Sequence, residues 1–401
     1  MRPRYILIML FFGFILSCSD EKIDNPLDPE AKLPAPELLW SQAFGGGDID
    51  RGRSLQLTND GGYIVTGYTN SFGAGIGDVW LIKTDGMGNG VWSQTFGGND
   101  IDRGFSVQLT NDGGYIVTGY TNSFGLGDAD VWLIKTDGMG NGVWSKTFGG
   151  VDTDVGLSLQ LTSDGGYIVT GYTSSFGAGS ADVWLIKTDG MGNEVWSQTF
   201  GGGDPDVGYS VQITDDGGYI VTGYTGSFGA GSADVWLIKT DGLGNEVWNK
   251  TFGGSDHDVG FSVQLTDDDG YIITGYTGSF GAGSADVWLI KTDGLGNEVW
   301  SQTFGGSDVD RGFSVQLTND DGYIVAGYTS SFGAGSADVW LIKTDELGNE
   351  VWSQTFGGIE SDIGRAIQLT NDAGYIVAGD TGSFPRDDLL LLKVNSLVVT
   401  P

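Results

Sequence analysis

The chain has 401 residues, with 71 glycines and 52 aspartates and glutamates against only 19 lysines and arginines. A formal net charge of −33 excludes nucleic acid as a partner, because a protein that binds nucleic acid needs a basic face. The single cysteine, Cys18, excludes an intrachain disulfide. Glycine does not recur at every third position, which excludes collagen, and its abundance is typical of short strands joined by tight turns.

The N-terminus has the features of a secretion signal. Residues 1–17 contain two arginines and then an apolar run that is too short for a comfortable membrane span. The run ends in Ile-Leu-Ser-Cys, which resembles the lipobox of bacterial lipoproteins, although that family prefers a small residue where Leu16 stands. The resemblance implies that residues 1–17 are a signal peptide and that Cys18 is lipidated and becomes the first mature residue.

Residues 18–37 follow as a proline-rich segment with little apolar content. Such a segment predicts a semi-rigid tether that extends by about 3.1 Å per residue. It would hold a folded domain clear of a membrane that carries the lipid on Cys18. We therefore expect a lipid-anchored protein of the bacterial cell envelope, at the outer membrane or the cell surface.

A 52-residue repeat fills residues 38–395. Two tryptophan series mark it, and their members are Trp40, Trp92, Trp144, Trp196, Trp248, Trp300 and Trp352, and Trp80, Trp132, Trp184, Trp236, Trp288 and Trp340. In the unit that starts at residue 313, the runs rich in β-branched and aromatic residues are 313–318, 322–329, 338–345 and 350–356. Turn residues separate these runs, which predicts four antiparallel strands per unit.

The strands of each unit have apolar residues at both parities, as in YIVTGY and VWLI. A sheet that is covered on one side only would alternate, so this pattern indicates burial on both faces, as in a propeller blade between two neighbours. Residues 38–44 match a fourth strand, and residues 389–394 match a third strand of a unit that lacks its own fourth. Pairing of these two segments would close a ring and protect its edges.

We therefore predict an all-β fold, a seven-bladed β-propeller with four antiparallel strands per blade, followed by a tail at residues 396–401. Each unit resembles kelch-like or SBBP (seven-bladed bacterial propeller) repeats, in the glycine that ends Tyr323–Gly327, in Asp338-Val339-Trp340 and in Trp352. Kelch units usually carry a Gly-Gly doublet after the second strand, where this chain has Thr-Gly-Tyr or Ala-Gly-Tyr. Neither family implies one activity.

Strand parity predicts two different faces. The short-turn face carries the first-to-second and third-to-fourth turns of each blade, and the long-loop face carries the second-to-third loops and the inter-blade loops. Long loops on a rigid scaffold are where binding usually resides, so we expect the long-loop face to be the working surface. Its candidate ligand-binding residues are aspartate pairs and phenylalanines, namely Asp48, Asp50, Asp100, Asp102, Asp152, Asp154, Asp204, Asp206, Asp256, Asp258, Asp308 and Asp310, and Phe72, Phe124, Phe176, Phe228, Phe280 and Phe332.

Each of these series has two interpretations. The aspartate pairs could bind Ca²⁺, but calcium takes six to eight oxygens, so we favour hydrogen bonds to backbone N–H groups in turns and assign no cofactor. The phenylalanines could stack on sugar rings, but we favour packing over the blade edge. A lysine recurs in the third strand of each unit, and the series is Lys83, Lys135, Lys187, Lys239, Lys291, Lys343 and Lys393. We favour an ion pair with an aspartate of the same or the neighbouring blade over the alternative, an anion-binding ring.

Catalytic chemistry is not indicated. The sequence has no nucleophile–base pair, zinc spacing or phosphate loop, and His257 occupies a position that varies among repeats. The divergent last repeat, with Asp380 where other blades have tyrosine, is interpreted as an adaptation to ring closure. We expect a binding module for extracellular glycan or protein, with an envelope scaffold as the alternative and a carbohydrate-active enzyme disfavoured.

Overall fold

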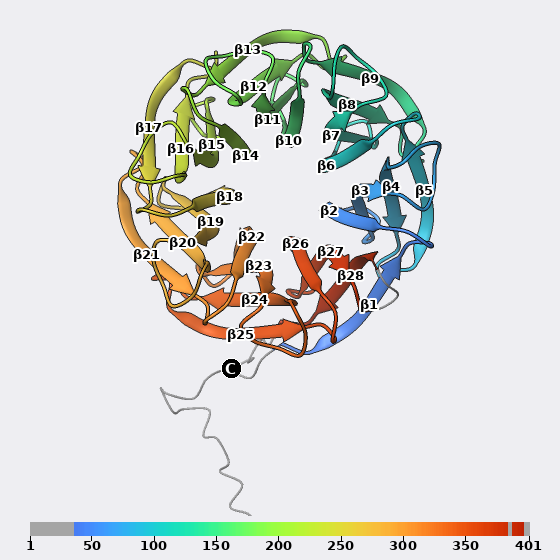
Figure 1. The fold of residues 1–401 in the computed structure, drawn as a ribbon. Coiled ribbons are helices and arrows are strands. Elements are labelled where there is room, and N and C mark those ends of the chain that lie inside the picture. The colour runs from blue at the N-terminus through green and yellow to red at the C-terminus, as the bar shows by residue number, and fades with distance from the viewer. Residues whose placement is uncertain (1–35, 384–386, 397–401) are drawn as a thin grey trace, which may run out of the picture. The chain divides into compact units, whose positions relative to one another are not determined.

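A computed structural model of the protein describes residues 36–383 and 387–396. The predicted signal peptide, Cys18, nearly all of the tether and residues 397–401 lie outside this part. All regular elements of the described residues are β-strands, and no helix long and apolar enough to cross a membrane is found among them. The strands form seven four-stranded antiparallel sheets in a ring around a common axis (Figure 1), which confirms the predicted propeller.

The first strand of each unit lies nearest the axis, and the second strand pairs with it (Figure 1). The innermost strands are β2 (Asp50–Leu57), β6 (Asp102–Leu109), β10 (Asp154–Leu161), β14 (Asp206–Ile213), β18 (Asp258–Leu265), β22 (Asp310–Leu317) and β26 (Asp362–Leu369). The second strands are β3 (Tyr63–Thr69), β7 (Tyr115–Thr121), β11 (Tyr167–Thr173), β15 (Tyr219–Thr225), β19 (Tyr271–Thr277), β23 (Tyr323–Thr329) and β27 (Tyr375–Thr381).

The third and fourth strands complete each blade toward the rim. The third strands are β4 (Asp78–Thr84), β8 (Asp130–Thr136), β12 (Asp182–Thr188), β16 (Asp234–Thr240), β20 (Asp286–Thr292), β24 (Asp338–Thr344) and β28 (Asp388–Val394). The outermost strands are β5 (Gly90–Phe96), β9 (Gly142–Phe148), β13 (Glu194–Phe200), β17 (Glu246–Phe252), β21 (Glu298–Phe304), β25 (Glu350–Phe356) and β1 (Leu38–Phe44).

The ring closes between the two ends of the repeat region, as predicted. Strand β1 pairs antiparallel with β28, so the last blade has the order β1-β28-β27-β26. Beyond the strand ends, Glu37 N donates to Asn395 Oδ1 at 2.7 Å, and Asn395 N donates to the Glu37 carbonyl oxygen at 3.1 Å. Main-chain pairing therefore covers the edge of β28 that would otherwise be free at the junction of the termini.

The hydrophobic core lies between blades, because both faces of each sheet are apolar. One cluster joins Ile168 and Leu185 of one blade to Val211, Val221 and Trp236 of the next, all of them buried. Burial of each such side chain contributes about 1.5–3 kcal/mol. A serine of the innermost strand also reaches the next blade: Ser158 Oγ accepts a hydrogen bond from Val211 N at 3.3 Å.

The innermost strands begin earlier than predicted. Where the sequence predicts a start at residue 313, β22 starts at Asp310, and Gly312 lies opposite Gly327 beside a β-bulge. Each innermost strand begins with Asp-x-Gly, and aspartate and glycine are both typical of turns, so the sequence pattern does not reveal this segment. The second aspartate of each pair is therefore the first residue of a strand and not a loop residue.

Candidate functional site

The aspartate pairs of the long-loop face are divided between solvent and interior. The first member of each pair is exposed, whereas the second is fully buried. In the first blade, Asp50 Oδ2 accepts hydrogen bonds from Gly46 N at 2.9 Å and Ser71 Oγ at 2.7 Å, and the same bonds recur in the other blades. The buried aspartates thus tie the inter-blade loop to the second-to-third loop, which is the turn role favoured for them.

A second carboxylate approaches each buried aspartate from the neighbouring blade. A methyl group on Gly45 would lie 2.0 Å from Asp388 Oδ1 and 2.7 Å from Asp50 Oδ2, so both oxygens border the same small space. Burial, together with the charges of Asp50 and Asp387, raises the pKa of Asp388 to about 6. Among the described residues, no group of three or more His, Cys, Asp or Glu side chains is placed to hold a metal ion.

The candidate phenylalanines are half-exposed, and each packs against a tryptophan of its own blade. Phe332 is 48% exposed, and its ring centroid lies 5.5 Å from that of Trp340 in the same blade. Phe72, Phe124, Phe176, Phe228 and Phe280 repeat this pairing. One side of each ring therefore packs on tryptophan, as the favoured interpretation has it, while much of the ring remains open to solvent.

A groove of about 500 Å³ lies beside Phe332 at the rim. Besides Phe332 and Trp340, its lining includes Ser353, Gln354 and Thr355 of the outermost strand β25. An aromatic ring next to hydroxyl and amide groups is suited to a ligand with both apolar and polar surface.

The repeated lysines make ion pairs within their own blades, as predicted. Lys83 Nζ lies 2.9 Å from Asp60 Oδ2 in the turn between β2 and β3, and each other third-strand lysine has the equivalent partner. Hydrogen bonds from Thr58 and Lys83 lower the pKa of Asp60 to about 2. The lysine series therefore has a structural role at the base of the short turns.

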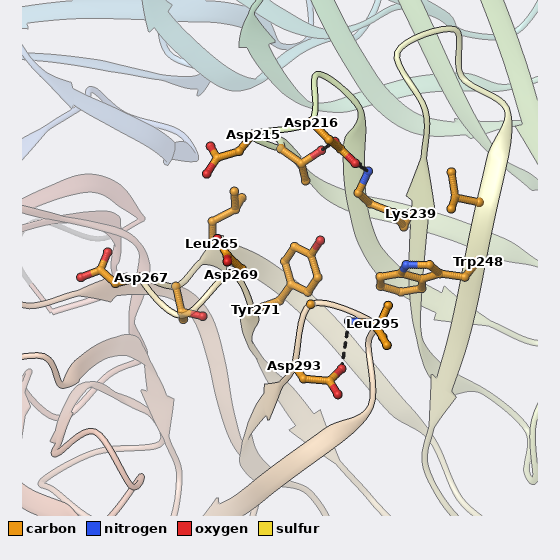
Figure 2. Close-up of a pocket in the computed structure, with 14 residues that line it drawn as sticks. Asp215, Asp216, Lys239, Trp248, Leu265, Asp267, Asp269, Tyr271, Asp293 and Leu295 are labelled. Atoms are coloured by element: carbon orange, nitrogen blue, oxygen red, sulfur yellow. Dashed lines mark hydrogen bonds and ion pairs between the residues drawn. The ribbon is translucent and has the colours of Figure 1, made fainter.

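The short-turn face carries grooves that the sequence did not predict. Figure 2 shows one of about 870 Å³ between two blades, where Trp248 of β17 meets Tyr271 of β19 with ring centroids 6.0 Å apart. Val247 and Leu295, 60% and 68% exposed, line it as well. A groove of about 780 Å³ repeats the arrangement around Trp300 and Tyr323 at the next junction.

The groove in Figure 2 is acidic as well as apolar. Asp215, Asp267, Asp269 and Asp293 line it, and its one lysine, Lys239, is paired with Asp216 at 2.7 Å. Burial and the neighbouring carboxylates raise the pKa of Tyr271 to about 12. The sequence signal for this groove is an apolar residue in each Asp-Gly-x-Gly-Asn turn. The pairing of tryptophan and tyrosine from adjacent blades cannot be seen in the sequence, because it depends on how the blades stack in the propeller.

The arginines of the described residues all lie on innermost strands, and we refer to them as the axial arginines: Arg51, Arg53, Arg103, Arg311 and Arg365. They occupy the second or fourth position of β2, β6, β22 and β26, which are consecutive around the ring (Figure 1). The equivalent positions of β10, β14 and β18 carry valine, leucine, tyrosine or phenylalanine. The axis is therefore lined asymmetrically, although the blades are otherwise near copies.

No family model matches the chain. The regulatory protein FlaEY of Caulobacter vibrioides is 26% identical over 211 residues, which are 45% of this chain and 21% of that protein, so the chain spans about a fifth of the relative's length. The kelch-like and SBBP labels consequently remain resemblances.

Solved propeller structures are similar in fold. The Pan2 WD40 domain of Neurospora crassa is 11% identical with a TM-score of 0.52, covering 85% of this chain and 88% of its own. Sqt1 of Chaetomium thermophilum is 13% identical with a TM-score of 0.50 (86% and 83% covered), and YCF48 bound to D1 peptide is 12% identical with a TM-score of 0.50 (89% and 97% covered). At these identities the likeness concerns the fold alone. The chain belongs to the class of β-propellers, an architecture suited to binding or scaffolding.

Proposed function

We propose that this chain is a binding module and not an enzyme, anchored by a lipid on Cys18 outside the cytoplasmic membrane, and that it binds glycan or protein on its long-loop face. The observation that carries the proposal is repetition. A half-exposed phenylalanine stands at the same place in blade after blade, and at Phe332 it borders a groove with hydroxyl and amide groups.

Equivalent weak sites suit a partner that is itself repetitive, such as a polysaccharide. Linked sites act at a high effective concentration, so that total avidity exceeds the affinity of each one by about 10²–10⁴-fold when the geometry allows simultaneous contact. Catalysis, in contrast, needs groups in different roles at one place. The near-identical blades favour the first arrangement.

A glycan array with the full chain in detergent tests the ligand class. We compare it with a variant in which all six candidate phenylalanines are replaced by leucine, since leucine keeps the apolar contact with tryptophan but removes the aromatic face. The matched control replaces the exposed apolar residues of the short turns by glutamine, at Met87, Met139, Met191, Leu243, Leu295 and Leu347.

A glycan signal that falls at least tenfold in the phenylalanine variant and persists in the control supports the long-loop face. Loss only in the short-turn control would move the site to the opposite face. Absence of any glycan signal refutes the glycan proposal and leaves a protein partner.

The scaffold alternative is favoured by the short-turn grooves. Their exposed Val247 and Leu295, with several aspartates around them, are complementary to a basic protein segment with an apolar side chain. If the chain crosslinks to an envelope protein and the glutamine variant of the short turns loses this crosslink, the scaffold role is supported. Unchanged crosslinking in that variant would contradict it.

The anchor is tested separately with Cys18→Ala. Without the thiol no lipid can be attached, so this variant is expected in the soluble fraction with an unchanged unfolding midpoint. Membrane association that persists in Cys18→Ala would refute the lipid anchor.

A further inference from the structure

The axial arginines are a feature of the described residues in which the repeats depart from sevenfold symmetry. Around the closing junction, Arg51, Arg53 and Arg365 line a pocket of about 290 Å³. The pocket also includes Glu360, Ser361, Gly382 and Asp387, which belong to inter-blade and second-to-third loops, so it lies at the end of the axis that faces the long-loop side.

Two of the three arginines are held in place by carboxylates. Arg365 Nε lies 3.2 Å from Asp380 Oδ2, and Arg51 Nη2 lies 3.1 Å from Asp387 Oδ1. Asp380 stands where the other blades have tyrosine, so the divergence of the last repeat provides a partner for an arginine in addition to any role in closure. Burial lowers the pKa of Arg365, and the positive charges of Arg53 and Arg51 act in the same direction.

The third arginine has no acidic partner among the described residues. The Nε of Arg53 is buried and has no hydrogen-bond acceptor there, and the same holds for the Nε atoms of Arg103 and Arg311. The Cζ atoms of Arg53 and Arg103 lie 5.6 and 4.3 Å from the centroid of the Tyr68 ring. These cation–π contacts stabilise the two guanidinium groups but do not neutralise their charge. A buried N–H without an acceptor costs about 1–3 kcal/mol, and more when the group is charged.

Apolar residues at the same position in other blades show that the fold does not require these charges. The position of Arg53 is occupied by Phe105, Leu157, Tyr209, Phe261 and Phe313 elsewhere in the ring. Arg365 also lies 4.4 Å from the Phe313 ring, and that ring is 4.9 Å from Phe261. The guanidinium group of Arg365 thus adjoins an arc of aromatic rings.

We propose that this pocket binds a small oxyanion, a phosphate or carboxylate group, with Arg53 as its principal ligand and Arg51 and Arg365 beside it. Guanidinium groups bind such anions through paired N–H donors, and Asp380 and Asp387 fix the orientation of the two flanking arginines. Glu360 is exposed, so solvent screens its repulsion of the anion, and the charge of the buried Asp380 is balanced by Arg365. The proposal is independent of the repeated grooves, because it concerns one site at one junction.

Calorimetric titration of the full chain in detergent, at constant ionic strength, tests the proposal with inorganic phosphate in one arm and acetate in the other. Arg53→Leu removes the unpaired charge and introduces the residue that the third blade carries as Leu157, so folding is expected to be kept. The control Lys146→Gln makes the same change of charge on outermost strand β9, where five of the other six blades have glutamine.

We expect one molar equivalent of phosphate or acetate to bind, at least tenfold more weakly in Arg53→Leu and unchanged in Lys146→Gln. Binding in one arm only identifies phosphate or carboxylate as the group recognised, and binding in both supports a general oxyanion site. Absence of binding in both arms overturns the proposal, as does equal binding by Arg53→Leu or equal weakening by both variants.

Discussion

Gly171→Ala is predicted to be among the most damaging small substitutions in this propeller. Gly171 of β11 lies opposite Gly156 beside the bulge of β10, and a Cβ atom there would be 1.8 Å from the Val155 carbonyl oxygen. Non-bonded heavy atoms need about 3.5 Å, so the two strands would have to move apart. Overpacking costs about 1–3 kcal/mol, and each ladder hydrogen bond that is lost adds about 1 kcal/mol. We expect a loss of about 3–5 kcal/mol in the free energy of unfolding.

Two other glycines serve as matched controls. Gly165 has a φ of 81° with nothing near its Cβ position, so Gly165→Ala should cost only about 1–2 kcal/mol of backbone strain. Gly203 has open space and no positive φ, so Gly203→Ala should be neutral or stabilising by about 0.4–1 kcal/mol. Urea unfolding followed by tryptophan fluorescence measures all three. If Gly171→Ala costs no more than Gly165→Ala, the close approach of β10 and β11 is wrong.

Three further predictions concern closure, pH and the inter-blade bonds. A chain that begins at residue 45 lacks β1 and exposes the edge of β28, so size-exclusion chromatography should show association, and a stable monomer would contradict the closure argument. Asp164 has a folded pKa of about 2, below its usual 3.8, so its stabilising effect is present above pH 4 and lost toward pH 2. The pKa of Asp388 is raised from 3.8 to about 6, so its ionisation removes stability as the pH rises from about 4 to 6. The unfolding midpoint should therefore be highest near pH 4 and decline between about pH 4 and 6, and Asp388→Asn should flatten that decline; a midpoint that rises steadily to pH 8 would refute this. Ser158→Ala leaves Val211 N without its inter-blade acceptor and should cost about 1 kcal/mol, measured by urea unfolding against the distant Ser145→Ala.

The sequence alone determined the number of blades, the number of strands in each and the way in which the ring closes. These features depend on local patterns, because every strand carries its own β-forming residues and every turn its own glycine and aspartate. The two incomplete units at residues 38–44 and 389–394 were also visible as a mismatch of phase. The paired lysines could be expected because a lysine among apolar strand residues requires a partner.

Only the tertiary structure decided which residues meet across blades. Whether Asp48 or Asp50 faces the interior depends on where the innermost strand starts, and Gly52 in that strand gives no signal of a strand. Trp248 and Tyr271 form a groove only because adjacent blades stack. Arg51 and Arg365, more than 300 positions apart in the chain, share a pocket only because β1 pairs with β28 and brings the last blade beside the first. The sequence predicts that the ring closes, but only the closed ring shows which side chains of the first and last blades meet, because no local pattern records contacts between distant segments.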